Sequence, residues 1–114
     1  MIFKLNFIKI HYMKKLVKVK VSGKLQKIGY RFQVLQMATD LGITGFIRQE
    51  SDNSIYLEAE GEEEELKKFM RFCKSGVDKA MVTDFQYESA EPVDHHGFTF
   101  GDYTVSDHYK KKGE

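Results

Sequence analysis

Stretches with the periodicity of strands and stretches with the periodicity of helices alternate along this chain, and their order limits the folds open to it. Residues 16–22 alternate three valines with Lys18, Lys20 and Ser22, the period of two expected of a half-buried strand. After a loop bounded by glycines, apolar residues recur at helical spacing up to Gly42, which takes the position of a helix C-cap. We predict a helix from about Tyr30 to Leu41 with these apolar positions: Phe32, Val34, Leu35, Met37, Ala38 and Leu41.

A β-hairpin is predicted next. Residues 44–50 and 54–60 are short β-favouring runs, and turn-forming residues occupy positions 51–53 between them. Every other residue of the second run is apolar, and these residues are expected to face inward: Ile55, Leu57 and Ala59.

A second helix is predicted in residues 61–76. Four acids, Glu62 to Glu65, begin it and lysines follow toward its end, a placement that complements the helix macrodipole. We therefore assign the acidic run to helix stabilisation and not to a metal site. The expected apolar face consists of Leu66, Phe69, Met70 and Cys73.

Two further strands, residues 80–89 and 98–105, are predicted on either side of a loop that contains Pro92, the only proline. The order is then βαββαβ with an additional C-terminal strand. Two crossover helices on one face of an antiparallel sheet make an α+β two-layer sandwich of the ferredoxin-like type. That fold hosts enzymes, RNA binders and small-molecule sensors, so it does not name a function.

A chain of 114 residues is expected to form one domain. We place this domain at residues 14–105, followed by a polar tail at 106–114. The first twelve residues are not expected to form a targeting signal, because lysines interrupt their apolar run and no cleavage site follows. Residues 1–13 are interpreted as a leader or a misassigned start, with translation beginning at Met13, because two lysines and then a clear strand pattern follow that methionine. The sequence contains no run of about 20 apolar residues, so no membrane span is predicted.

Basic residues are concentrated near the N-terminus. Residues 1–31 hold nine of the 18 basic side chains and none of the 17 acids, although the net charge is only +1. The balance excludes a general polyanion binder, and the asymmetry points to the N-terminal third as the place for an anion. Taken singly, Lys18 and Lys20 fit equally well as the solvated face of a strand.

Cysteine and histidine add no site. A single cysteine, Cys73, cannot form an internal disulfide or a multi-cysteine zinc site, and its place on a helix's apolar face indicates a buried, inert thiol. This composition predicts a reducing, cytoplasmic location. His95 and His96 are adjacent and have no metal-ligand spacing to Cys73, so we interpret them as loop residues.

The segment from Val21 to Arg31, VSGKLQKIGYR, carries the chemistry. It leads from a strand through a loop with glycines at both ends into a helix N-terminus, and backbone amides in such a loop suit a phosphate or a carboxylate. Arg31 adds a planar fork of donors that matches two phosphate oxygens. The candidate phosphate-binding residues are Gly23, Lys24, Leu25, Gln26, Lys27, Ile28, Gly29 and Tyr30.

This segment resembles the signature of the acylphosphatases, in which a valine, a glycine, a glutamine, a second glycine and an arginine stand where Val21, Gly23, Gln26, Gly29 and Arg31 stand here. A second block, GFIRQESDNSI at residues 45–55, is similar to the family's second signature of glycine, tryptophan, valine, a basic residue and asparagine before a turn. The resemblance extends over residues 16 to about 103.

The resemblance implies hydrolysis of the carboxyl-phosphate bond of small acyl phosphates, without a metal or an organic cofactor. Loop amides and Arg31 would hold the phosphoryl group, and Gln49, in the place of the family asparagine, would orient the attacking water. Catalysis would then consist of positioning and charge stabilisation. No nucleic acid or membrane partner is expected, and the absence of an apolar seam favours a monomer.

Two departures from the family pattern leave an alternative open. Gln49 is longer than asparagine by one methylene, and Lys27 replaces a loop glycine, where a lysine is strained if the position needs a positive φ. Low activity follows if Gln49 misplaces the water. The alternative is therefore a weak or inactive phosphate-binding regulatory module of the same fold. RNA binding through Phe46 and Tyr56 is a third and poorer interpretation, because the characteristic basic and aromatic series is missing.

Overall fold

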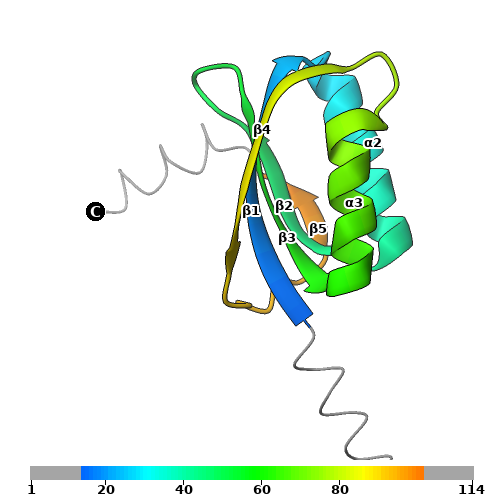
Figure 1. Ribbon diagram of the computed structural model, residues 1–114, viewed down its shortest axis with the longest axis vertical. Coiled ribbons are helices and arrows are strands. Elements are labelled where there is room, and N and C mark those ends of the chain that lie inside the picture. Colours follow the sequence, from blue (N-terminus) through cyan, green and yellow to red (C-terminus); the bar gives the residue numbers. More distant parts are fainter. Residues whose placement is uncertain (1–13, 102–114) are drawn as a thin grey trace, which may run out of the picture.

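A computed structural model of the chain describes residues 14–101, in which five strands form one sheet and two helices cover one of its faces (Figure 1). The elements are β1 (Lys14–Lys24), α2 (Lys27–Leu41), β2 (Thr44–Gln49), β3 (Ile55–Glu62), α3 (Glu63–Ser75), β4 (Met81–Ala90) and β5 (Phe98–Phe100). The predicted α+β, ferredoxin-like sandwich is confirmed. The predicted leader, the polar tail and residues 102–105 of the last predicted strand lie outside the described residues.

The sheet is mixed, with strand order β4-β1-β3-β2-β5. The β1–β3, β1–β4 and β2–β3 pairs are antiparallel, whereas β5 runs parallel to β2, with Phe98 opposite Gly45 and Phe100 opposite Ile47. The prediction of a purely antiparallel sheet is therefore wrong at β5. The reason is the connection 91–97, which carries the chain from one edge of the sheet to the other, so that β5 starts where β2 starts.

The core lies between the sheet and the helices. The alternating valines of β1 and the predicted inward residues of β3 are buried, and so are Leu66, Phe69 and Cys73 on the inner face of α3. The periodicity of these three segments therefore predicted their buried sides correctly. Burial raises the pKa of the Cys73 thiol, as expected of an inert core cysteine.

Helix α2 begins at Lys27, three residues before the predicted start, and only part of its predicted apolar set is buried. Its core residues are Tyr30, Val34 and Ala38, whereas Phe32 is 57% exposed. The Tyr30 hydroxyl donates a hydrogen bond to the Cys73 carbonyl oxygen at 2.7 Å, which ties α2 to α3. Apolar residues occur on more than one side of α2, so their spacing alone did not determine which side packs inward.

A buried carboxylate holds the connection between β4 and β5. Glu60 of β3 is fully buried and accepts three backbone hydrogen bonds, from Val93 at 2.6 Å, Asp94 at 3.0 Å and His95 at 2.6 Å. Asp94 has a positive φ of 62°, which helps successive amides to point at one acceptor. Burial raises the pKa of Glu60, but these amides outweigh that effect and hold it below its ordinary value. The carboxylate thereby fixes the chain just before β5.

Candidate active site

The site begins where β1 ends. Gly23 has φ 141°, and its register with β4 shifts at a bulge between Ser22 and Gly23. A Cβ at Gly23 would collide with the Met81 carbonyl oxygen of β4, so the close approach of the two strands requires a glycine there. The bulge redirects the chain from the sheet toward the start of α2.

The N-terminus of α2 supplies unpaired backbone donors. The Tyr30 amide donates to the Gln26 carbonyl oxygen at 3.1 Å and so closes the first helical turn. The amides of residues 27–29 precede that bond and have no partner within the helix, as at every helix start. Among the side chains that the structure describes, none caps this end, and the positive end of the helix dipole is left to interact with an anion.

The loop differs in detail from the prediction. The left-handed residue is Gln26, with φ 51°, and not Lys27, which starts the helix; the strain considered for Lys27 therefore does not arise. Tyr30 was placed in the phosphate-binding loop, but its side chain is in the core and its amide is bonded within the helix. Leu25 is also buried, whereas Lys24, Gln26, Ile28 and Gly29 are exposed.

An open pocket brings the loop and β2 together. Its lining comes from the loop and first helical turn, together with one residue at the end of β2: Gly23, Lys24, Leu25, Gln26, Ile28 and Gln49. The two signature blocks, separated in sequence, thus meet at one end of the sheet. The lining offers a lysine, a carboxamide and a helix N-terminus, a combination suited to a small anion.

Gln49 is half-buried at the end of β2, where it pairs with Ile55 of β3. Its Nε2 donates to Oδ1 of Asn53 at 3.4 Å, a long and therefore weak hydrogen bond. The carboxamide of Gln49 is thus held by the β2–β3 turn and remains easy to reorient.

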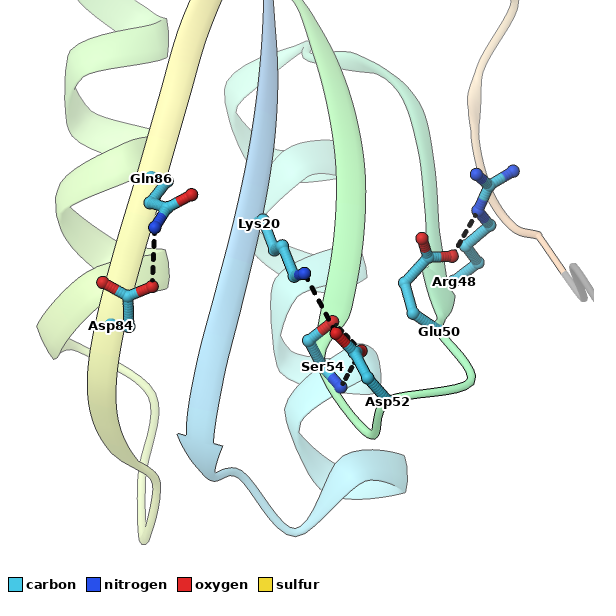
Figure 2. A network of polar contacts seen from close by, with 7 residues as sticks. All are labelled: Lys20, Arg48, Glu50, Asp52, Ser54, Asp84 and Gln86. Atoms are coloured by element: carbon cyan, nitrogen blue, oxygen red, sulfur yellow. Dashed lines mark hydrogen bonds and ion pairs between the residues drawn. The ribbon is translucent and has the colours of Figure 1, made fainter.

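Asp52 organises the β2–β3 turn that holds Gln49. Its carboxylate accepts hydrogen bonds from the amide and hydroxyl of Ser54 and forms an ion pair with Lys20 of β1 at 3.0 Å (Figure 2). The Ser54 and Lys20 contacts hold the pKa of Asp52 well below its ordinary value. Figure 2 also shows Arg48 paired with Glu50 at the start of the turn. Lys20 and Arg48 are therefore both paired with carboxylates of the turn.

Arg31 lies one turn into α2 and is half-buried. Its Cζ is 5.6 Å from the centre of the Phe100 ring in β5, and its buried Nε has no hydrogen-bond partner in the part of the chain that the structure describes. None of the ion pairs within residues 14–101 involves its guanidinium. Arg31 does not line the pocket that joins the loop to Gln49. The structure therefore brings the loop and Gln49 together, with Arg31 on the adjoining face of α2.

Phe100 is the neighbour of Arg31 that sequence reasoning missed. Its position depends on the parallel pairing of β5 with β2, which no local pattern in the sequence reveals. The only available signal was the alternation of Phe98 and Phe100 around Thr99, which predicted a strand but not its place in the sheet.

Other sites find little support among the described residues. Within residues 14–101, no group of three or more His, Cys, Asp or Glu side chains is arranged to hold a metal ion. His95 instead lies 2.9 Å from Glu58 through its Nε2 and packs edge-on against Phe46. Neither α2 nor α3 is long and apolar enough to cross a bilayer.

Comparison with known proteins places this geometry in a family. The acylphosphatase family model matches residues 17–100. An acylphosphatase of Caldanaerobacter subterraneus subsp. tengcongensis is 40% identical over 74 residues, which cover 65% of this chain and 82% of that protein. One of Thermotoga petrophila is 32% identical over 89 residues, covering 78% of this chain and 99% of that protein.

Solved structures agree with the sequence relatives. An acylphosphatase from Coxiella burnetii superimposes with a TM-score of 0.75 at 25% identity, over 82% of this chain and 98% of that one. The region matched by the family model includes both signature blocks and extends from within β1 to the end of β5. The chain therefore belongs to the acylphosphatase family.

Proposed function

We propose that the chain hydrolyses small acyl phosphates, with the phosphoryl group held at the loop from Gly23 to Gly29 and by Arg31, and with the water oriented by Gln49. As a member of the acylphosphatase family the chain is a hydrolase, and small acyl phosphates are the substrates of that family. The observation that carries the proposal is the pocket in which Gln49 faces the loop and the N-terminus of α2.

The phosphoryl group is matched by donors that need no rearrangement. The free amides at the start of α2 already point along the helix axis, and the helix dipole favours a negative charge there. Lys24 is exposed in the same lining and adds a positive charge. Such preorganised donors stabilise charge that grows on phosphoryl oxygens during transfer.

Arg31 supplies the second half of the phosphate clamp in this proposal. A buried Nε without an acceptor is unusual in a folded protein, because an unmet buried donor costs free energy. A phosphate oxygen beside Arg31 is a suitable acceptor once the side chain turns and exposes this nitrogen. The ring of Phe100 supports the guanidinium through a cation–π contact.

Gln49 orients the nucleophile. Its carboxamide leaves the weak hydrogen bond to Asn53, and its Oε1 accepts a hydrogen bond from the water, whose oxygen bonds to phosphorus as the bond from phosphorus to the acyl oxygen breaks. The carboxylate leaves with the bonding electrons, and the water proton passes to the products or to solvent. A monomeric state, a cytoplasmic location and independence from metals and organic cofactors are part of the same proposal.

The test is a kinetic assay with an acyl phosphate on wild type, Arg31→Ala and Gln49→Asn, with Arg71→Ala on the exposed face of α3 as the matched arginine control. We expect Arg31→Ala to lower kcat/KM by about 10²- to 10³-fold, as for the loss of one charge-stabilising donor. Gln49→Asn should raise kcat, because the shorter side chain has one torsion fewer to fix. Arg71→Ala should behave as wild type.

Two other results would change the assignment. A wild-type protein that turns over no acyl phosphate, yet binds inorganic phosphate saturably and loses this binding in Arg31→Ala, is a phosphate-binding module. If Arg31→Ala alters neither turnover nor phosphate affinity, the site has been placed wrongly.

A further inference from the structure

Three large apolar side chains are exposed beside the proposed phosphate site. Ile28 is 66% exposed, Phe32 57% and Phe100 41%. Apolar side chains scattered singly over a surface need no explanation, but a group of them at a polar pocket is characteristic of ligand sites. We call these three residues the apolar strip.

The apolar strip is continuous with the pocket. Ile28 belongs to both, because it lines the pocket together with Gln49 and the loop. Phe32 follows Ile28 by four residues on the same face of α2, and its ring meets the ring of Phe100 edge-on at 5.1 Å between centroids. Figure 1 shows how this arises, since β5 runs along the edge of the sheet beneath α2.

Arg31 lies within the same face. It falls between Ile28 and Phe32 in the helix, three residues after the first and one before the second, and its guanidinium lies over Phe100. The strip therefore borders both proposed phosphate-holding elements, the loop and the arginine. A substrate whose phosphate is bound there has its remaining part within reach of the strip.

We propose that the apolar strip is the subsite for the acyl group and that the chain prefers acyl phosphates whose acyl group is aromatic or bulky and apolar. This inference rests on the proposed function. A ring laid on Ile28, Phe32 and Phe100 removes apolar surface from water, whereas a methyl group covers little of it. Three side chains provide an area suited to one ring and are far short of the roughly 800 Å² per partner of a protein interface.

The experiment compares benzoyl phosphate with acetyl phosphate. Phe32→Ala should lower the ratio of their kcat/KM values by about 3- to 10-fold, mainly through a higher KM for benzoyl phosphate, because one ring contact of this kind is lost. Phe32→Tyr should restore the ratio, since it keeps the ring. Val93→Ala is the matched control: Val93 is 59% exposed but lies in the β4–β5 connection, away from the strip, and the ratio should not change.

Product inhibition gives a second measurement that is independent of turnover. Benzoate should inhibit wild type competitively and more strongly than acetate, and Phe32→Ala should reduce this difference. A fall of equal size for both substrates, or an unchanged ratio in a folded Phe32→Ala, overturns the subsite. Failure of the proposed function has a different signature, namely no turnover of either substrate by wild type.

Discussion

The glycine at position 29 is not required by the fold, but it is required by the proposed site. It lies in the first turn of α2, is exposed, and an added Cβ would contact nothing within 4 Å in residues 14–101. Neither sterics nor a positive φ requires a glycine there, in contrast to Gly23. In the proposed site, a bare backbone at that point allows the phosphoryl group to approach the free amides of the turn closely.

Gly29→Ala is therefore expected to raise stability and lower activity. Alanine favours the helix by about 0.5–1 kcal/mol over glycine, which should appear as an increase in the free energy of unfolding measured by urea titration. The methyl group displaces the phosphoryl group, and kcat/KM for an acyl phosphate should fall by on the order of a hundredfold.

Gln36→Ala, at an exposed position further along α2, is the control for helix propensity without a ligand contact. It should leave kcat/KM unchanged. A Gly29→Ala protein that is more stable and fully active would show that phosphate does not approach this turn.

At the scale of single elements, sequence periodicity predicted most of the scaffold because most segments bury one clear side. β1 and β3 alternate between core and surface, and α3 has one apolar face; their predicted and observed buried residues agree. α2 is apolar on more than one side, so its inward face depends on the contact of Tyr30 with α3. The place of β5 depends on the connection before it, which Glu60 holds through Val93, a residue 33 positions further along the chain. Such long-range contacts leave no periodic trace.

In the candidate site, too, the features that depend on local sequence were predicted and those that depend on long-range contacts were not. The motif identified the loop and Gln49, and the structure brings five of the eight predicted loop residues into one pocket with Gln49. The sequence pattern did not show that the Tyr30 amide is bonded within the helix. Which amides at a helix start are free depends on the first helical residue, and sequence patterns do not determine that residue. The neighbour of Arg31 was equally hidden, since Phe100 reaches it through the parallel β2–β5 pair.

The connection between β4 and β5 yields a prediction at this scale. Glu60→Gln keeps an acceptor oxygen but removes the charge that three amides share, so we expect a loss of about 1–3 kcal/mol in the free energy of unfolding. Hydrogen exchange at the Gly45 amide, which donates to the Gly97 carbonyl oxygen at 2.8 Å, should accelerate as β5 loosens. Glu88→Gln, an exposed carboxylate on β4, is the control. Equal losses in the two variants would refute an anchoring role for Glu60.

At the scale of the whole molecule, the polar contacts on the face of the sheet opposite the helices and in its turns make stability depend on pH. The pKa of Asp52 is lowered by Ser54 and Lys20. For Glu58, burial raises the pKa, but hydrogen bonds from Tyr56 and His95 outweigh it, and the pKa is again below its ordinary value. Glu60 behaves likewise through its three amides. All three carboxyl groups thus bind protons less tightly in the folded chain than in the unfolded one.

The sign of the effect follows from this difference. Each group contributes its stabilisation fully above its unfolded pKa, which is 4.5 for the glutamates and 3.8 for the aspartate, and loses it as pH falls through the lower folded pKa. The free energy of unfolding, measured by urea titration at several pH values, should therefore be greatest near neutral pH and decrease steadily below about pH 4.5. Glu60→Gln removes one of the three groups, so its curve should start lower at pH 7 and fall less steeply in acid. Equal stability of wild type at pH 7 and pH 3 would contradict the linkage, and a Glu60→Gln curve parallel to that of wild type would remove Glu60 from it.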